Sequence, residues 1–156
     1  MITNIRTTIA AIPGFLCLLL LSACATTAPM QEMSDARQSV QAAFEVGAEE
    51  HAAQNLDAAR DYLERAEREL EMRFFARARH DAMIAKNEAI KAHNVSVAIR
   101  DAKSAIDEST VADDELAEAR EMLGKAEAAA AQGRDRSAIR FAEDARRLAQ
   151  GELERR

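Results

Sequence analysis

Apolar residues along most of the chain recur every three or four positions, which is the spacing of one buried stripe on an α-helix. The two clearest stripes consist of Leu56, Ala59, Leu63, Ala66 and Leu70 and of Ala78, Ala82, Ala85, Ala89 and Ala92. No proline follows Pro29, and Ala, Glu, Arg and Leu, which all favour helices, dominate the composition. The pattern therefore predicts an all-α fold.

Interruptions of these stripes divide the region after Pro29 into about five helices. Gly133 suits the left-handed end of a helix, and Asp113 suits an N-terminal cap. The other breaks are expected near residues 54–55, 73 and 109–110. The predicted helices span residues 30–50, 55–72, 74–108, 113–132 and 134–153.

A shift of 60 residues aligns two parts of the chain with each other. The identical pairs include Leu56, Ala59, Arg60, Leu63, Ala66 and Glu67 with Leu116, Ala119, Arg120, Leu123, Ala126 and Glu127, and Ala78, Ala82, Ala85 and Ala89 with Ala138, Ala142, Ala145 and Ala149. These matches keep register across a turn, which indicates a tandem duplication, although alanine-rich helices raise the number of chance matches. We therefore expect a first helical repeat at residues 30–90 and a second at residues 91–156. Tandem helical hairpins would then form an elongated, alanine-rich bundle.

The N-terminal segment has a different character. Arg6 is its only charged residue, and the apolar run over residues 9–21 has the length of a signal-peptide core, whereas a membrane span needs roughly 20 apolar residues. The following Leu21-Ser22-Ala23-Cys24 resembles the lipobox of bacterial lipoproteins, in which the cysteine thiol takes a diacylglycerol and a peptidase cleaves before it. An ordinary secretory signal that ends near a cysteine is the alternative.

The lipobox resemblance has consequences for the mature chain. It makes residues 1–23 a cleaved signal peptide, Cys24 the lipidation site and residues 24–29 a lipidated tether. Cys17 is lost with the signal, so the mature chain has no second thiol for an intramolecular disulfide. Enterobacterial lipoproteins retained in the inner membrane favour Asp after the cysteine, and the Ala25 found here implies the inner leaflet of the outer membrane, facing the periplasm.

The charge and the expected partners follow from this maturation. Removal of Arg6 with the signal leaves 20 basic and 27 acidic side chains, a net charge of −7. This charge argues against nucleic acid as a partner. We expect the protein to hold the membrane through the covalent lipid on Cys24 and to bind an envelope protein or the cell wall.

A second resemblance covers most of the mature chain. Residues 55–60, Asn-Leu-Asp-Ala-Ala-Arg, together with residues 63–66 and 75–79, resemble the alanine-rich helical domain known as domain of unknown function 4398, and residues 115–149 resemble it more weakly. That family occurs on envelope lipoproteins of Gram-negative bacteria, sometimes beside peptidoglycan-binding OmpA-like domains. No OmpA-like domain follows here, and the family has no established catalytic residues to transfer.

The sequence offers little catalytic or metal-binding chemistry. His51, His80 and His93 are far apart, no Glu-x-x-His pair is present, and each histidine is expected at the surface. Serine and threonine residues do not form an arrangement suited to a nucleophile, and no glycine-rich phosphate loop occurs. We therefore expect no enzyme activity, no cofactor and no metal.

Two functions from different classes remain. The first is a structural or adaptor lipoprotein of the cell envelope, whose helical hairpins present a surface to a partner. The second is a periplasmic carrier or chaperone whose helices part to hold a lipid or another apolar ligand. The alanine stripes favour the first function, because small side chains let helices pack closely and leave little room for a ligand.

The turns of the two hairpins differ most, which suggests a binding site. The second repeat has Gln-Gly-Arg-Asp at residues 132–135, whereas the first has Met-Arg-Phe-Phe at residues 72–75. Two adjacent aromatic residues on a helix point about 100° apart, so both cannot point inward. Aromatic residues and arginine are typical of binding hot spots. The predicted partner-binding residues are Arg73, Phe74, Phe75, Arg77 and Arg79. Alternatively, Phe75 packs into the hairpin and Phe74 caps the preceding helix.

Overall fold

The computed structural model describes residues 27–151, and its regular structure is helical throughout these residues. The helices are α2 (Met30–Glu45), α3 (Ala48–His51), α4 (Ala53–Glu71), α5 (Phe75–Asp107), α6 (Asp113–Ala131) and α7 (Asp135–Ala149). No strand occurs between residues 27 and 151. The predicted all-α fold is therefore confirmed. The signal segment and Cys24 lie outside the described residues.

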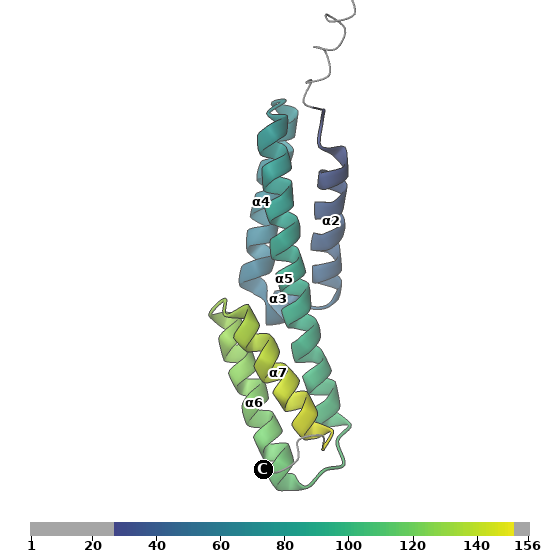
Figure 1. The fold of residues 1–156 in the computed structure, drawn as a ribbon, viewed down its shortest axis with the longest axis vertical. Helices are drawn as coiled ribbons and strands as arrows, with labels where there is room; N and C mark the ends of the chain where they lie inside the picture. Colours follow the sequence, from purple (N-terminus) through teal and green to yellow (C-terminus); the bar gives the residue numbers. More distant parts are fainter. Residues whose placement is uncertain (1–26, 152–156) are drawn as a thin grey trace, which may run out of the picture.

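Helix α5 runs through the whole bundle. Its 33 residues span about 50 Å, at 1.5 Å per residue. Figure 1 shows α2 and α4 along the first half of α5, and α6 and α7 along its second half. The molecule is therefore elongated, with three helices side by side in each half, as the sequence predicted.

The helix boundaries agree with the prediction to within two residues, except that α7 ends at Ala149 and not at residue 153, and except in the first predicted helix. This helix was expected to run from residue 30 to residue 50, but it ends at Glu45 and a short helix starts at Ala48. Gly47 separates them with a φ angle of 83°, a left-handed conformation that glycine adopts without steric cost. The prediction of one continuous helix is therefore wrong, because this glycine turns the chain toward α4.

The helix boundaries repeat with a shift of 60 residues. Helices α4 and α6 start at Ala53 and Asp113, and helices α5 and α7 start at Phe75 and Asp135. With the same shift, α2 corresponds to residues 90–105 of α5, which pack beside α6 and α7. The α4–α5 and α6–α7 hairpins therefore have equal first helices and equal turns. The division into two repeats at residue 90 stays a prediction.

Small side chains form most of the core. One cluster of buried residues extends across both halves of the bundle and contains alanines of α2, α3, α4, α5, α6 and α7 together with Leu56, Val95 and Ile99. Alanine lets helix backbones approach to the lower end of the usual 8–10 Å separation. The two hairpins therefore share one continuous and closely packed core.

Ion pairs hold α2 against α5. The Glu32 carboxylate accepts a 2.7 Å hydrogen bond from Arg79, and the Asp35 carboxylate accepts one of 2.8 Å from Lys86. The pKa of Glu32 is lowered, first by a backbone hydrogen bond and then by Arg79. The pKa of Asp35 is lowered mainly by the hydrogen bond from Lys86. Because both pairs follow the same order along the two helices, α2 runs parallel to α5 and the two helices start at the same end of the bundle.

Candidate functional site

The turn between α4 and α5 is a compact helix end with an unusual central residue. The Arg73 amide donates to the Leu70 carbonyl at 3.0 Å, and the Phe74 amide donates to the Glu69 carbonyl at 2.8 Å. Arg73 has a φ angle of 61° and is the non-glycine residue with a positive φ angle among the described residues. This conformation costs an ordinary residue about 1 to 2 kcal/mol. The turn therefore keeps an arginine where a glycine would be less strained.

The side chains of this turn form an exposed aromatic and basic surface. Met72 is 56% exposed and Phe74 is 48% exposed, while Phe75 is half-buried. The guanidinium carbon of Arg77 lies 5.3 Å from the centre of the Phe74 ring, within the range of a cation–π interaction. A hollow of about 300 Å³ lies among Arg73, Phe74, Phe75, Ala76 and Arg77. Four of the five predicted partner-binding residues therefore lie together.

Arg79, the fifth predicted residue, lies apart from this hollow. Its guanidinium donates to the Glu32 carboxylate of α2 at 2.7 Å and to the carbonyl of Thr27 at 3.2 Å. Arg79 therefore ties the first described residue of the chain to α5. Its guanidinium is thus engaged with α2 and the preceding residues, and its role in binding a partner stays a prediction.

A groove that the sequence analysis missed adjoins the turn. It has a volume of about 490 Å³ and is lined by Arg65, Glu69, Ala76, Arg77, His80 and Asp81. Asp81 is buried and pairs with Arg65 of α4. One carboxylate oxygen of Glu69 is buried without a hydrogen-bond partner. Asp81 lies three residues after Ala78 on the buried stripe, and this spacing could have predicted its burial.

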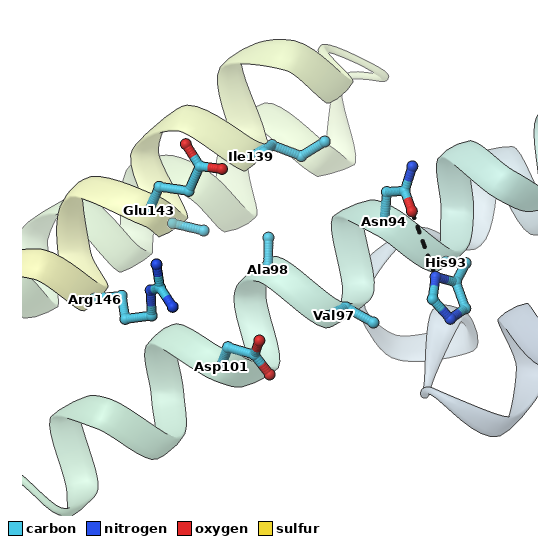
Figure 2. A pocket seen from close by; sticks show the side chains of 9 residues that line it. His93, Asn94, Val97, Ala98, Asp101, Ile139, Glu143 and Arg146 are labelled. Carbon is cyan, nitrogen blue, oxygen red and sulfur yellow. Dashed lines mark hydrogen bonds between the residues drawn. The ribbon is translucent and has the colours of Figure 1, made fainter.

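A second groove lies between the second half of α5 and α7, with a volume of about 370 Å³. Figure 2 shows Asp101 of α5 on one side and Glu143 and Arg146 of α7 on the other. Val97 and Ile139 provide its larger apolar side chains. The groove is thus a charged surface depression with a small apolar lining, and it lacks the large apolar side chains expected of a lipid cavity.

The corresponding surface of the first half of the bundle is filled. A shift of 60 residues places Met33 at the position of His93, and the Met33 side chain is completely buried. The same shift places Arg79, which pairs with Glu32, at the position of Ile139. The comparison of the two repeats could therefore have predicted the groove from the sequence.

The histidines do not form a metal site. Among residues 27–151, no group of three or more His, Cys, Asp or Glu side chains could hold a metal ion. His80 is exposed, whereas the His51 side chain is only 10% exposed, so the expected surface position is wrong for His51. Burial lowers the pKa of His51, nearby Lys103 lowers it further, and Glu50 and Glu127 act in the opposite direction.

The described helices also lack a membrane span. None of those between Thr27 and Gly151 combines the length and the apolar composition needed to cross a bilayer. Cys24, the predicted lipidation site, precedes the described residues, so the structure gives no geometry for its thiol. The lipid attachment stays a prediction from the sequence.

Comparison with known proteins identifies the first half of the bundle. No curated protein and no solved structure matches the chain. Residues 31–96, which extend from α2 into the second half of α5, match the model of a protein family described as Domain of unknown function (DUF4398). The match does not reach α6 and α7, for which the weaker resemblance stays a prediction. The resemblance predicted for the first repeat is confirmed, because residues 31–96 are similar to this family.

Proposed function

We propose that this protein is a lipid-anchored, non-catalytic lipoprotein with a structural or adaptor role in the cell envelope. The observation that carries the proposal is the sequence Leu21-Ser22-Ala23-Cys24 at the end of an apolar segment. Acyl chains on Cys24 would contribute about 0.8 kcal/mol for each buried methylene group, so two or three chains would make the attachment effectively permanent. The helical bundle would then present its surface to a partner close to the membrane.

The described part of the bundle supports a binding role over catalysis. Its alanine core packs the helices closely, and ion pairs fix α2 against α5. Such a rigid body suits the display of a surface, because a preformed surface loses little conformational entropy on binding. The exposed aromatic and basic turn between α4 and α5 is one surface that is available for a contact outside the bundle.

The alternative role as a carrier of lipids or other apolar ligands has less support. A carrier needs a cavity that encloses most of its ligand in apolar surroundings. The groove in Figure 2 is open and has Asp101, Glu143 and Arg146 around it. We therefore favour an adaptor that acts from the inner leaflet of the outer membrane toward the periplasm and binds an envelope protein or the cell wall.

The two cysteines of the sequence provide a matched test of the anchor. Cells expressing the full chain would be labelled with palmitate, and their membranes would be separated after high-salt washing. The Cys24→Ser variant should lose the label and its normal maturation, whereas Cys17→Ser should keep both. If Cys24→Ser still fractionated with the outer membrane, the lipoprotein proposal would be wrong.

The adaptor role needs a separate test in intact cells. We would crosslink the full-length protein in growing cells and identify the captured molecules by mass spectrometry. An adaptor should capture a defined envelope protein or peptidoglycan fragment, and this capture should decrease in the Cys24→Ser variant, which is no longer held at the membrane. Capture of phospholipid alone by both proteins would favour the carrier role instead.

A further inference from the structure

The α4–α5 turn and residues 27–29, the part of the tether that the structure describes, lie at the same end of the bundle. Figure 1 shows this turn beside the start of α2, while the α6–α7 turn lies near the middle of the molecule. The hydrogen bond from Arg79 to the Thr27 carbonyl fixes the start of the described chain against the first turns of α5. Any group attached to the preceding residues is therefore held near the α4–α5 turn.

The short chain length between Cys24 and Thr27 limits how far the lipid can be. Three residues span at most about 10 Å when fully extended. Phe74, the N-cap of α5, precedes Arg79 by five residues, so its backbone lies about 8 Å nearer this end of the bundle than the backbone of Arg79, at 1.5 Å per residue. Along the axis of the bundle, Cys24 and the backbone of the turn can therefore extend to similar distances. The side chains of the turn extend beyond its backbone.

Several exposed apolar side chains lie at this end, while Phe44, Met83 and Ile90 are exposed elsewhere on the bundle. Met30, at 62% exposed, starts α2, and exposed Met72 and Phe74 lie in the adjacent turn. Arg73 and Arg77 flank these residues. We refer to this set, Met30, Met72, Arg73, Phe74 and Arg77, as the tether-end surface. Phenylalanine and other apolar side chains beside arginines suit the boundary between lipid headgroups and acyl chains, where the apolar groups enter the membrane and the arginine head groups stay at its surface.

We propose that the tether-end surface contacts the lipid leaflet that holds the acyl chains of Cys24, with Phe74 and Met72 entering the headgroup region. This inference rests on the proposed lipid anchor. It adds a second membrane contact that orients the long axis of the bundle away from the membrane. The second hairpin would then be the part presented to a partner in the periplasm.

The α6–α7 turn shows that charge alone does not distinguish the tether-end surface. Residues 71–77 contain two arginines and one glutamate, and residues 131–137 contain two arginines and one aspartate. The two turns therefore carry the same formal charge, and they differ in apolar content, because Met72 and Phe74 replace Gln132 and Arg134. This difference favours a lipid surface over an acidic partner.

The absence of tryptophan from the sequence allows a direct test. We would prepare Phe74→Trp and the matched control Arg134→Trp as full-length, lipidated proteins and insert them into vesicles of phosphatidylethanolamine and phosphatidylglycerol. One set of vesicles would carry brominated acyl chains, which quench tryptophan on contact. Phe74→Trp should emit at shorter wavelength and lose most of its fluorescence in the brominated vesicles. Arg134→Trp should show neither change.

Flotation of the vesicles separates failure of this inference from failure of the anchor. Phe74→Trp could float with the vesicles and yet have the emission wavelength of Arg134→Trp and no quenching by brominated chains. The proposed membrane contact would then be wrong, while the lipid anchor would stand. If neither protein floats, the lipid anchor is wrong and the inference falls with it. Phe74→Trp could also stay unquenched while Phe74→Ala loses a crosslinked envelope protein. This result would show that the surface binds a protein and would overturn the proposal.

Discussion

The turns of the two hairpins have the same backbone but different surroundings. Arg73 and Gly133 occupy the same left-handed position, with φ angles of 61° and 65°. In each turn the amides of this residue and the next one donate to the same two positions at the end of the preceding helix. The backbone of the turn is therefore independent of the residue at its centre.

The α6–α7 turn packs against the first half of the bundle. The Asn55 side chain of α4 donates a 3.1 Å hydrogen bond to the Asp135 carboxylate. A Cβ atom on Gly133 would lie only 2.8 Å from a side-chain oxygen of Gln54. The α4–α5 turn instead exposes Met72 and Phe74. The comparison teaches that the α6–α7 turn, although exposed, has a glycine where the Gln54 side chain of α4 lies close, whereas the α4–α5 turn keeps a strained, exposed arginine that is available for binding.

Truncation of a leucine to alanine in each half of the bundle should give the largest difference in the free energy of unfolding. Leu56 is completely buried in the core cluster that joins both hairpins, whereas its counterpart Leu116 is only partly buried, in the first turn of α6. Leu56→Ala should lower the free energy of unfolding by about 2 to 5 kcal/mol, through lost burial and a residual cavity. Leu116→Ala should have a clearly smaller effect. Urea unfolding followed by circular dichroism measures both, and equal losses would contradict the shared core.

An exchange of the two central turn residues should have a smaller effect, with opposite signs. Gly133→Arg should destabilise the protein by about 1 to 3 kcal/mol, because the arginine backbone has to adopt the left-handed conformation and its Cβ atom displaces the Gln54 side chain. Arg73→Gly relieves the same backbone strain in the folded protein. Part of this gain in stability is offset because glycine gives the unfolded chain more conformational entropy. The expected stabilisation is therefore less than about 1 kcal/mol.

Thermal and urea unfolding of the two turn variants provide the measurement. The matched control is Arg134→Ala, which changes a neighbouring turn residue without changing the left-handed position. If Arg73→Gly destabilised the protein as much as Gly133→Arg does, the arginine would be stabilising the turn through its side chain. The interpretation of Arg73 as a strained residue kept for binding would then be wrong.

The sequence predicted the helices because their signals are local. Apolar spacing and helix propensity placed the starts of α4, α5, α6 and α7 within two residues of those in the structure. The break at Gly47 was missed because a lone glycine after a helical stripe does not by itself show whether the helix ends there. The chain turns at this residue because α3 packs against α5, a contact that spacing does not reveal.

The candidate site was predicted less completely because it depends on contacts between distant residues. The exposure of one of the two adjacent residues Phe74 and Phe75 followed from the geometry of a helix start. The position of Arg79 did not, because its partner Glu32 lies 47 residues earlier on another helix. The burial of His51 likewise depends on α5 and α6, which supply Lys103 and Glu127 beside it. Sequence periodicity identifies a buried face but not the residue that packs on it.

His51 provides the last and smallest test, at the junction of the two halves. Burial, assisted by Lys103 and opposed by Glu50 and Glu127, lowers the pKa of His51 below its ordinary value of 6.5. The unfolded chain therefore takes up this proton at a higher pH than the folded protein does, and the free energy of unfolding should fall as the pH decreases through about 6.5. Above pH 7 the ring is neutral in both states and has no such effect. His51→Gln should reduce the slope of the free energy of unfolding against pH between pH 7 and 5, measured by urea unfolding. The matched control is His80→Gln at an exposed position, which should keep the slope. An unchanged slope in His51→Gln would show that His51 does not contribute to the pH dependence of folding.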